Sequence, residues 1–318
     1  MAVGGPIQVP PATLSFAARL RQRLGPAVPY RRDEVVMGYL FILVPMVIFL
    51  TFSFAGMIFD FWISFHHWDL LSPPQFRGLD EYSYLFRQDI WWRAIRNTIE
   101  YSLIVVPTQT VIAFTLALIV NQNMRGQKFF RTTFYVPSVT SSVAISLLFL
   151  YLMNNYGLVN YVLRQVGIQN PPNWLADTHT ALPSIMGLNI WTTTGTLMII
   201  FLAALQDVPR DVLEATAIDG ATGFQAVSRV VIPLVRPALF FVVANGLIGT
   251  LQIFDQAFVL SQGNGGPENA TMTAVLYLYN TAFKDGFYGV AAAGSFLLFA
   301  FIFVATITVR RLIGEEAR

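Results

Sequence analysis

The residue types that usually catalyse reactions are scarce in this chain. It contains no cysteine, so disulfides and thiolate metal sites are excluded. Its three histidines, His66, His67 and His179, lack the spacing of metal ligands, and no H-E-x-x-H motif occurs. No G-x-x-x-x-G-K-[ST] motif is present to cradle the phosphates of ATP. The sequence therefore predicts that the chain is not an enzyme and holds no metal or cofactor.

The side chains that could do chemistry are mostly neutral hydrogen-bonding groups inside long apolar runs. Asn189 is followed by Trp191 and four threonines, and amides and hydroxyls beside an aromatic ring suit an uncharged, hydroxyl-rich solute. Serine and threonine in apolar helices can equally bond their own backbone. Asp255 is charged; a solute site and an ion pair or helix-packing bond are equally open for it. The candidate binding residues are Ser138, Asn189, Thr193, Thr196, Asn245, Gln252 and Asp255.

These residues belong to a chain that is 55% hydrophobic and only 12% charged, whereas soluble domains carry about a quarter charged residues. Six apolar runs are long enough to cross roughly 30 Å of hydrocarbon. An all-α membrane protein in the lipid bilayer is predicted, and a net charge of +2 gives no reason to expect nucleic-acid binding. The expected segments are a tail 1–34, spans 35–59, 101–124, 134–153, 182–206, 237–260 and 287–309, a connector 207–236, and a tail 310–318.

The distribution of positive charge predicts the orientation. With the N-terminal tail inside, 14 of the 20 Lys and Arg residues fall in inner segments and 6 in outer ones. The positive-inside rule therefore places both termini in the cytoplasm of a multi-pass membrane protein. The connector 207–236 then faces the cytoplasm as well.

The connector 207–236 carries the signals of two short helices. Asp211 favours a helix start, because unpaired N–H groups there attract negative charge. Gly220 favours the end of that helix near residue 219. Thr222 and Gln225 have the T-x-x-Q spacing of a capping box, which begins a second helix. A helix–turn–helix at the inner membrane surface is expected.

One face of the first helix suits a protein partner. Glu214, Ala217, Ile218 and Ala221 recur at i, i+3, i+4 and i+7, which places them together. An acid among small or apolar residues fits a groove on another protein. The alternative is an amphipathic interfacial helix, which would usually carry Lys or Arg and bulky apolar residues.

The connector resembles the EAA loop of binding-protein-dependent ABC importer permeases. The resemblance rests on "EAT" at 214–216, "DGA" at 219–221 and "IP" at 232–233, with Thr216 in place of the usual alanine. Other stretches are similar to the carbohydrate subgroup, near the larger permease of maltose-type importers. They are "FRGLDEYSYLF", "RGQKFFRTTFYVPSV", "FDQAFVLSQGNGGPENAT", in which Phe258 and Ser261 replace tyrosine and threonine, and "AFKDGFYGVAAAGSFLLF".

The resemblance implies a multi-pass protein of a bacterial or archaeal cell (inner) membrane. It also implies that this loop is a coupling helix, seated in a cleft of a separate cytoplasmic ATPase. Glu214 would pair with a basic residue there, and Gly220 would supply the turn. In maltose-type permeases an asparagine in the span before the loop contacts sugar, and Asn189 aligns with it by its spacing from Glu214. The residues implied for coupling are Glu214, Ala215, Ala217, Ile218, Asp219, Gly220 and Ala221.

The implied partners are a second, different permease, two ATPase subunits that bind ATP and Mg, an extracytoplasmic solute-binding protein and a sugar, of di- or oligosaccharide size. Glycerol phosphate or another small solute remains an alternative substrate. An ion-coupled secondary transporter would need buried acids or histidines, for which Asp255 is the one candidate. Neither that class, nor a channel, nor an intramembrane enzyme explains the connector 207–236.

Overall fold

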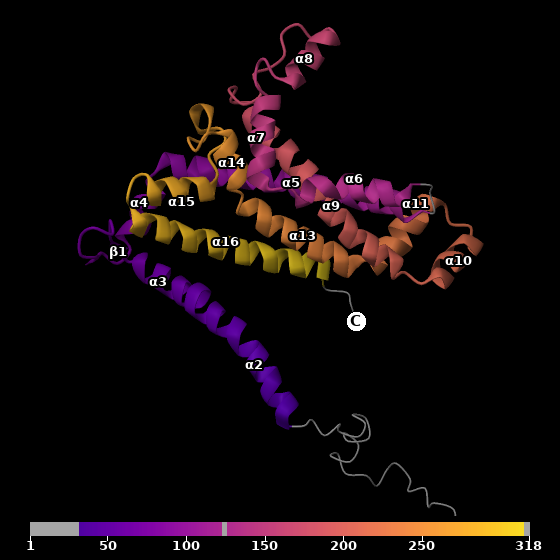
Figure 1. Cartoon of the computed structure of the whole chain (residues 1–318), viewed down its shortest axis with the longest axis horizontal. Helices are drawn as coiled ribbons and strands as arrows, with labels where there is room; N and C mark the ends of the chain where they lie inside the picture. Colours follow the sequence, from indigo (N-terminus) through magenta and orange to yellow (C-terminus); the bar gives the residue numbers. More distant parts are fainter. Residues whose placement is uncertain (1–31, 123–125, 315–318) are drawn as a thin grey trace, which may run out of the picture. The chain divides into compact units, whose positions relative to one another are not determined.

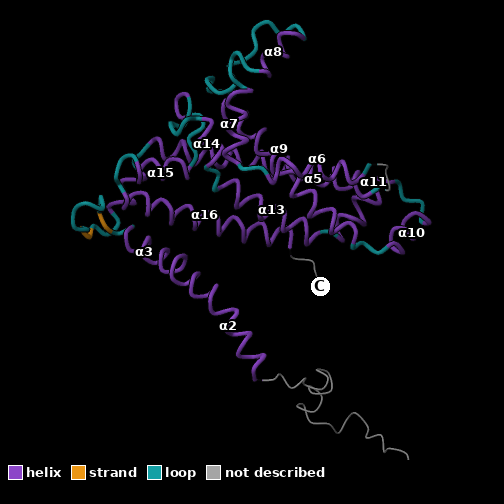
Figure 2. Tube along the Cα trace, in the orientation of Figure 1, coloured by secondary structure: helices purple, strands orange, loops and turns teal. Residues whose placement is uncertain are grey.

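The computed structural model describes residues 32–122 and 126–314 and is mostly helical (Figure 2). The expectations about residues 1–31, 123–125 and 315–318 lie outside the described residues. The chain divides into two compact units, Met1–Phe59 and Asp60–Arg318. In the described part, five helices are long and apolar enough to cross a membrane, or six if one bent pair counts as a single span. This confirms the predicted all-α membrane fold class.

The first unit is described from α2 (Arg32–Ile48) through a π-helical turn, η2 (Phe49–Phe54), into α3 (Ala55–Ile63). Pro45 removes one backbone donor from α2, and the wider π-helical turn follows four residues later. The apolar helical stretch is Val36–Ile63, 28 residues, which is longer than the roughly 20 residues that a membrane requires. It extends past the predicted end at residue 59.

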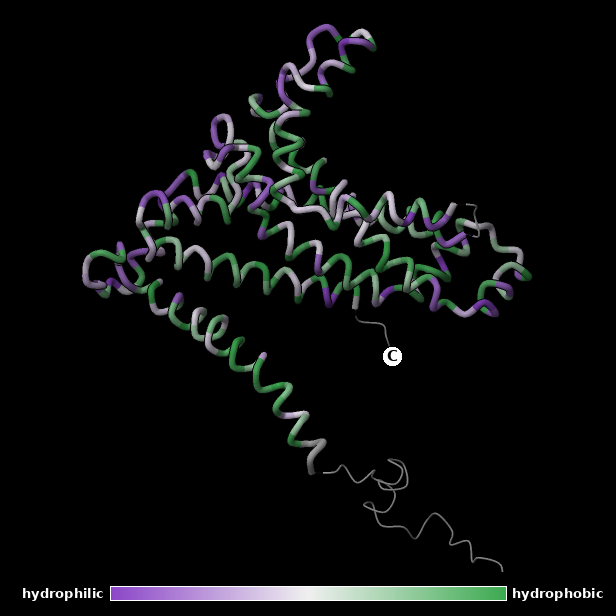
Figure 3. The backbone as a smooth tube through the Cα atoms, in the orientation of Figure 1, coloured by the Kyte–Doolittle hydropathy of each residue, from purple (hydrophilic) through white to green (hydrophobic). Residues whose placement is uncertain are grey.

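The second unit is built on four long helices: α5 (Asp89–Asn121), α9 (Ala181–Gln206), α13 (Arg236–Leu251) and α16 (Tyr288–Gly314). Helix α5 packs along α9, and α13 packs between α5 and α16 (Figure 1). Small residues of α5 make the close contact with α9, because Ala113 and Ala117 face Met198 and Phe201 in one buried cluster. Most of the residues along α13 and α16 are hydrophobic, whereas the connectors contain more hydrophilic residues (Figure 3).

The third predicted span, 134–153, is two helices rather than one. Helix α6 (Gln127–Val139) and α7 (Ser142–Leu152) meet at a bend of 94°. Pro137 lies in the last turn of α6, and Thr140 and Ser141 are extended, with ψ of 145° and 128°. Proline weakens the helix, and hydroxyl side chains offer the backbone other hydrogen bonds. The break follows from these local residues.

Shorter elements connect the long helices. They are a two-stranded hairpin of β1 (His66–His67) and β2 (Gln75–Phe76), then α4 (Asp80–Phe86), α8 (Leu158–Gln165), α14 (Asp255–Leu260), the 3-10 turn η4 (Pro267–Asn269) and α15 (Ala274–Phe283). Glu81 of α4 is buried and lies 2.9 Å from Nδ1 of His67, which ties the hairpin to α4. The predicted fifth span, 237–260, is α13 followed by α14, with a break at residues 252–254.

Candidate coupling loop and translocation path

The connector between α9 and α13 begins with α10 (Arg210–Ile218), which lies with α11 at one end of the second unit (Figure 1). Asp211 is in the first turn of α10, as the sequence predicts. Glu214 lies in the middle of α10 and is exposed, and among the described residues it has no ion-pair partner. Its carboxylate is therefore available to a group outside this chain.

A Schellman turn ends α10. Gly220 has φ of +74°, and its N–H donates to the carbonyl oxygen of Ala217 at 3.1 Å. The N–H of Ala221 donates to the carbonyl oxygen of Thr216 at 3.2 Å. This pair of bonds defines the motif, with glycine at its left-handed position. The predicted end near residue 219 is confirmed, but Ala221 does not continue the helical face, because α10 stops at Ile218.

The second helix starts with the predicted capping box. The side chain of Thr222 accepts from the N–H of Gln225, and the side chain of Gln225 accepts from the N–H of Thr222 at 2.9 Å. The chain continues as α11 (Gly223–Ala226), a π-helical turn η3 (Val227–Val231) and α12 (Ile232–Leu234). Ile218 is 86% exposed and Phe224 is 82% exposed. The loop therefore presents two large apolar side chains together with the acid at 214.

Two of the predicted binding residues lie together in the helical core. The hydroxyl group of Thr193 is 2.7 Å from Oε1 of Gln109 on α5 and 2.8 Å from the carbonyl oxygen of Asn189. Gln109 is buried, and its amide lies against α13 at Gly246. Asn189 is buried too, and its Oδ1 has no hydrogen-bond partner among the described residues. We call Gln109, Asn189 and Thr193 the polar cluster.

Gln109 was not among the sequence candidates, although an amide within the apolar run 101–124 was a usable signal. What the sequence does not supply is its partner, because Thr193 is 84 positions away along the chain. The amide is brought to Thr193 by the packing of α5 against α9. All three members of the polar cluster are neutral.

Ser138 and Thr196 meet where α6 crosses α9. Oγ of Ser138 accepts from the backbone N–H of Thr196 at 3.2 Å, and the side chain of Thr196 is exposed. Between them Gly195 is packed so closely that a Cβ there would lie 2.1 Å from the carbonyl oxygen of Phe134. In the structure Ser138 thus serves helix packing, through a hydrogen bond to backbone.

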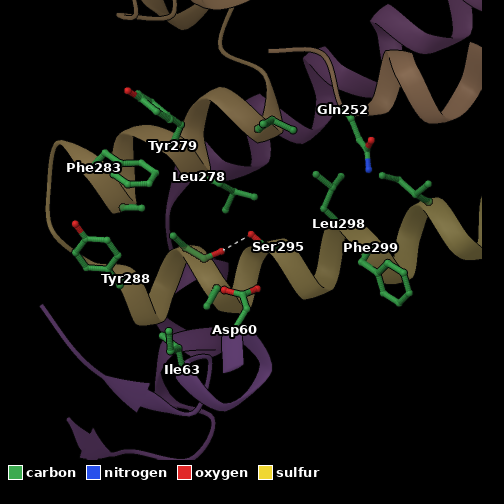
Figure 4. Close-up of a pocket in the computed structure, with 15 residues that line it drawn as sticks. Asp60, Ile63, Gln252, Leu278, Tyr279, Phe283, Tyr288, Ser295, Leu298 and Phe299 are labelled. Atoms are coloured by element: carbon green, nitrogen blue, oxygen red, sulfur yellow. Dashed lines mark hydrogen bonds between the residues drawn. The ribbon is translucent and has the colours of Figure 1, made fainter. Parts of the chain in front are cut away.

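Gln252 lines a cavity of about 580 Å³ between α13, α15 and α16 (Figure 4). Most of the lining is apolar, and the end of α3 contributes Asp60. The predicted first span stopped one residue before Asp60, which is why this acid was missed. Asn245 is exposed on α13, and Asp255 is exposed in the first turn of α14. Neither lies in the polar cluster or lines this cavity.

Comparison with known sequences identifies the protein family. Residues 109–314 match the family described as "Binding-protein-dependent transport system inner membrane component". The chain belongs to this family. It is a multi-pass inner-membrane permease subunit of an ABC transporter, as the loop at 214–233 predicted.

Curated relatives cover most of the chain. The probable ABC transporter permease protein YesP of Bacillus subtilis is 32% identical over 87% of this chain and 90% of its own length. The lactose transport system permease protein LacF of Rhizobium radiobacter is 36% identical over 66% of this chain and 71% of its own length. The trehalose/maltose transport system permease protein MalF of Thermococcus litoralis is 32% identical over 86% of this chain and 92% of its own length.

The fold also matches a solved structure, a bacterial ABC transporter involved in the import of the acidic polysaccharide alginate. The TM-score is 0.78 at 22% sequence identity, covering 94% of this chain and all of the other. Another structure of a bacterial alginate ABC transporter, in complex with an alginate pentasaccharide-bound periplasmic protein, matches with a TM-score of 0.76 at 23% identity, covering 92% of this chain and 96% of that one. These likenesses support the permease fold.

Proposed function

We propose that this permease forms half of the membrane path for a neutral sugar of di- or oligosaccharide size. The observation that carries the proposal is the buried amide oxygen of Asn189, which has no partner among the described residues. A buried polar atom without a partner is rare and is explained by a ligand or water. Beside it lie the uncharged Gln109 and Thr193, and relatives are named for lactose and for trehalose and maltose.

The neutral chemistry of the polar cluster favours a sugar over the alternatives. A glycerol phosphate path would need a cation to pair with the phosphate, and neither Lys nor Arg belongs to the cluster. An ion-coupled secondary transporter would use a buried acid or histidine within its spans, and Asp255, the candidate for that role, is exposed. The buried Glu81 belongs to the short connecting helix α4, where it lies against His67. Uptake driven by ATP rather than by an ion gradient distinguishes the permease from a secondary transporter, and the solute that accumulates distinguishes a sugar from glycerol phosphate.

The remaining subunits follow from the proposal. A second, different permease completes the path, and two ATPase subunits bind ATP and Mg and supply the energy. An extracytoplasmic binding protein delivers the sugar. The connector of α10 and α11 faces the cytoplasm, as do both termini, and docks in the ATPase. Glu214 pairs there with a basic residue, while Ala217, Ile218 and Ala221 contact the cleft wall.

The docking role can be tested with Glu214→Ala in the assembled transporter. We expect ATP hydrolysis to continue while uptake of radiolabelled sugar is lost, because the carboxylate no longer holds α10 in the moving ATPase. Glu214→Lys should be worse, since it brings like charges together. Asp211→Ala, which removes an exposed acid one turn earlier, is the matched control and should keep its uptake. Full coupled uptake by both variants at 214 would refute the docking role.

The binding role can be tested with Asn189→Ala. One lost neutral hydrogen bond, worth about 1 kcal/mol, should raise the KM of uptake roughly fivefold. Asn121→Ala, which removes an exposed amide at the end of α5, is the control. Unchanged uptake by Asn189→Ala, with normal assembly, would remove this residue from the path.

A further inference from the structure

A separate cavity of about 540 Å³ lies among the connectors. It is lined from three segments: the end of α7 with the residues after it, the connector before α9, and the turn after α14. The coupling loop is at the other end of α9, which begins at Ala181 and ends at Gln206. A 26-residue helix is about 39 Å long. The cavity therefore lies near the opposite end of α9 from α10.

The polar lining of this cavity consists of neutral side chains, and none of the described residues that line it is charged. We call it the amide cleft. Its apolar surface includes Leu150, Met153 and Leu260. The polar residues are Asn154, Asn155, Asn173, Ser261, Gln262 and Asn264.

Most of these amides are unused by the protein. The side chains of Asn155, Asn173, Gln262 and Asn264 are exposed, and none has a hydrogen bond within ranges 32–122 and 126–314. By contrast, Oδ1 of Asn154 accepts from the N–H of Tyr156 at 3.1 Å. Each free amide offers both donors and an acceptor. The cleft thus presents a convergent set of groups without internal partners.

The backbone that presents one of these amides is held in a strained conformation. Gln262 has φ of +53°, which a non-glycine residue rarely adopts. The next residue is fixed from α15, because Nδ2 of Asn280 and Nζ of Lys284 donate to the carbonyl oxygen of Gly263 at 3.0 and 2.6 Å. Such strain persists where surrounding contacts over-determine it, and it is concentrated at functional sites.

We propose that the amide cleft is a carbohydrate-binding station at the entrance of the path, distinct from the polar cluster. This inference rests on the proposed sugar import. Amides pair with sugar hydroxyls as donors and acceptors, while leucine and methionine side chains can cover the apolar face of a sugar ring. The volume is within the roughly 300–1,000 Å³ of small-molecule sites. The uncharged lining selects against anionic solutes.

The cysteine-free sequence gives a direct test. Asn173→Cys and Asn264→Cys are made singly, and the whole transporter is reconstituted in vesicles with its binding protein. A hydrophilic methanethiosulfonate reagent labels the new thiol, and the label on this chain is read by mass. The probes are neutral mono-, di- and trisaccharides that include lactose, trehalose and maltose. Gln165→Cys, on α8 outside the cleft, is the matched control.

The sugar that the vesicles accumulate should slow labelling at both cleft positions and leave Gln165→Cys unchanged. At ten times the dissociation constant the labelling rate should fall about tenfold, because only the unoccupied fraction reacts. Accumulation of a sugar without protection at either cleft position overturns the inference and leaves the proposed function intact. If the vesicles accumulate none of the sugars, both the inference about the amide cleft and the proposed function are overturned. If the sugar-free binding protein slows labelling at the cleft positions and sugar slows it no further, the cleft is a docking surface for that protein. This result also overturns the inference.

A pair of variants at Gln262 separates its amide from its backbone. In the Asn264→Cys background, Gln262→Gly keeps the left-handed conformation and removes the amide, whereas Gln262→Asn keeps both. The sugar concentration for half-protection should rise about three- to tenfold in the glycine variant, the range for one lost neutral hydrogen bond. In the asparagine variant it should stay within about twofold. Equal values for the two variants would refute a role for this amide.

Discussion

The contact between α6 and α9 gives a sharp prediction for Gly195→Ala. A Cβ at this position would lie 2.1 Å from the carbonyl oxygen of Phe134, 1.3 Å short of the 3.4 Å at which ordinary contact begins. The opposing atom belongs to the backbone and cannot rotate away. Insertion of the methyl group must therefore push α6 and α9 apart, and it disturbs the hydrogen bond between Ser138 and the N–H of Thr196.

The magnitude follows from two opposing effects. Overpacking a tight contact costs about 1–3 kcal/mol, and a rigid backbone partner places this site near the upper value. Replacing glycine by alanine within a helix contributes about 1 kcal/mol in the other direction. The net expectation is a loss of about 2 kcal/mol. Gly187 is also in α9, but a Cβ there would meet nothing within 4 Å, so Gly187→Ala should be stabilising by about 1 kcal/mol.

Thermal unfolding of the purified transporter, followed by the solubility of this chain, ranks the two variants against the wild type. Gly187→Ala should unfold at or above the wild-type temperature and Gly195→Ala below it. Adding Ser138→Ala should not rescue Gly195→Ala, because the hydroxyl is removed but the carbonyl oxygen of Phe134 stays. An unchanged or higher unfolding temperature for Gly195→Ala would refute the close helix contact on which the reasoning depends.

Three further predictions concern turns and the polar cluster. Gly246→Ala should lower uptake, since its Cβ would lie 2.6 Å from Nε2 of Gln109, whereas Gly249→Ala on the same helix meets nothing within 4 Å and should not. Gly220→Ala should weaken coupling of ATP hydrolysis to uptake, because a left-handed alanine costs about 1 kcal/mol, and Gly220→Asn should retain more coupling. Thr222→Ala removes the capping side chain. The free energy of local opening of the following turn, measured by native-state hydrogen exchange, should therefore fall by about 1 kcal/mol.

Features set by neighbouring residues were predictable from the sequence. The end of α10 at Gly220 and the capping box of Thr222 and Gln225 depend on residue types within a few positions, and both are confirmed. The membrane class follows from composition, and the comparisons confirm the family. The bend after Val139 was missed, because hydropathy averaged over a span hides the local effect of Pro137.

Features that depend on packing between distant segments were not predictable in this way. The partner of Thr193 is on another helix, and Gly195 resembles any other helical glycine until α6 is placed against it. Ser138 was chosen for its chemistry, but its Oγ accepts from backbone. Asn189 is buried, its Oδ1 has no hydrogen-bond partner in the part of the chain that the structure describes, and its role in binding stays a prediction. Each outcome turns on tertiary contacts that a single sequence does not encode locally.

The Schellman turn and the capping box follow each other directly between α10 and α11. Together they bond the backbone amides of residues 220–222 and of Gln225 within the chain itself. The turn between α10 and α11 is accordingly preformed, and little conformational entropy is left to lose when a partner binds. If the connector docks in an ATPase as proposed, that subunit meets a preformed surface, and its displacement would move α10 and α11 together.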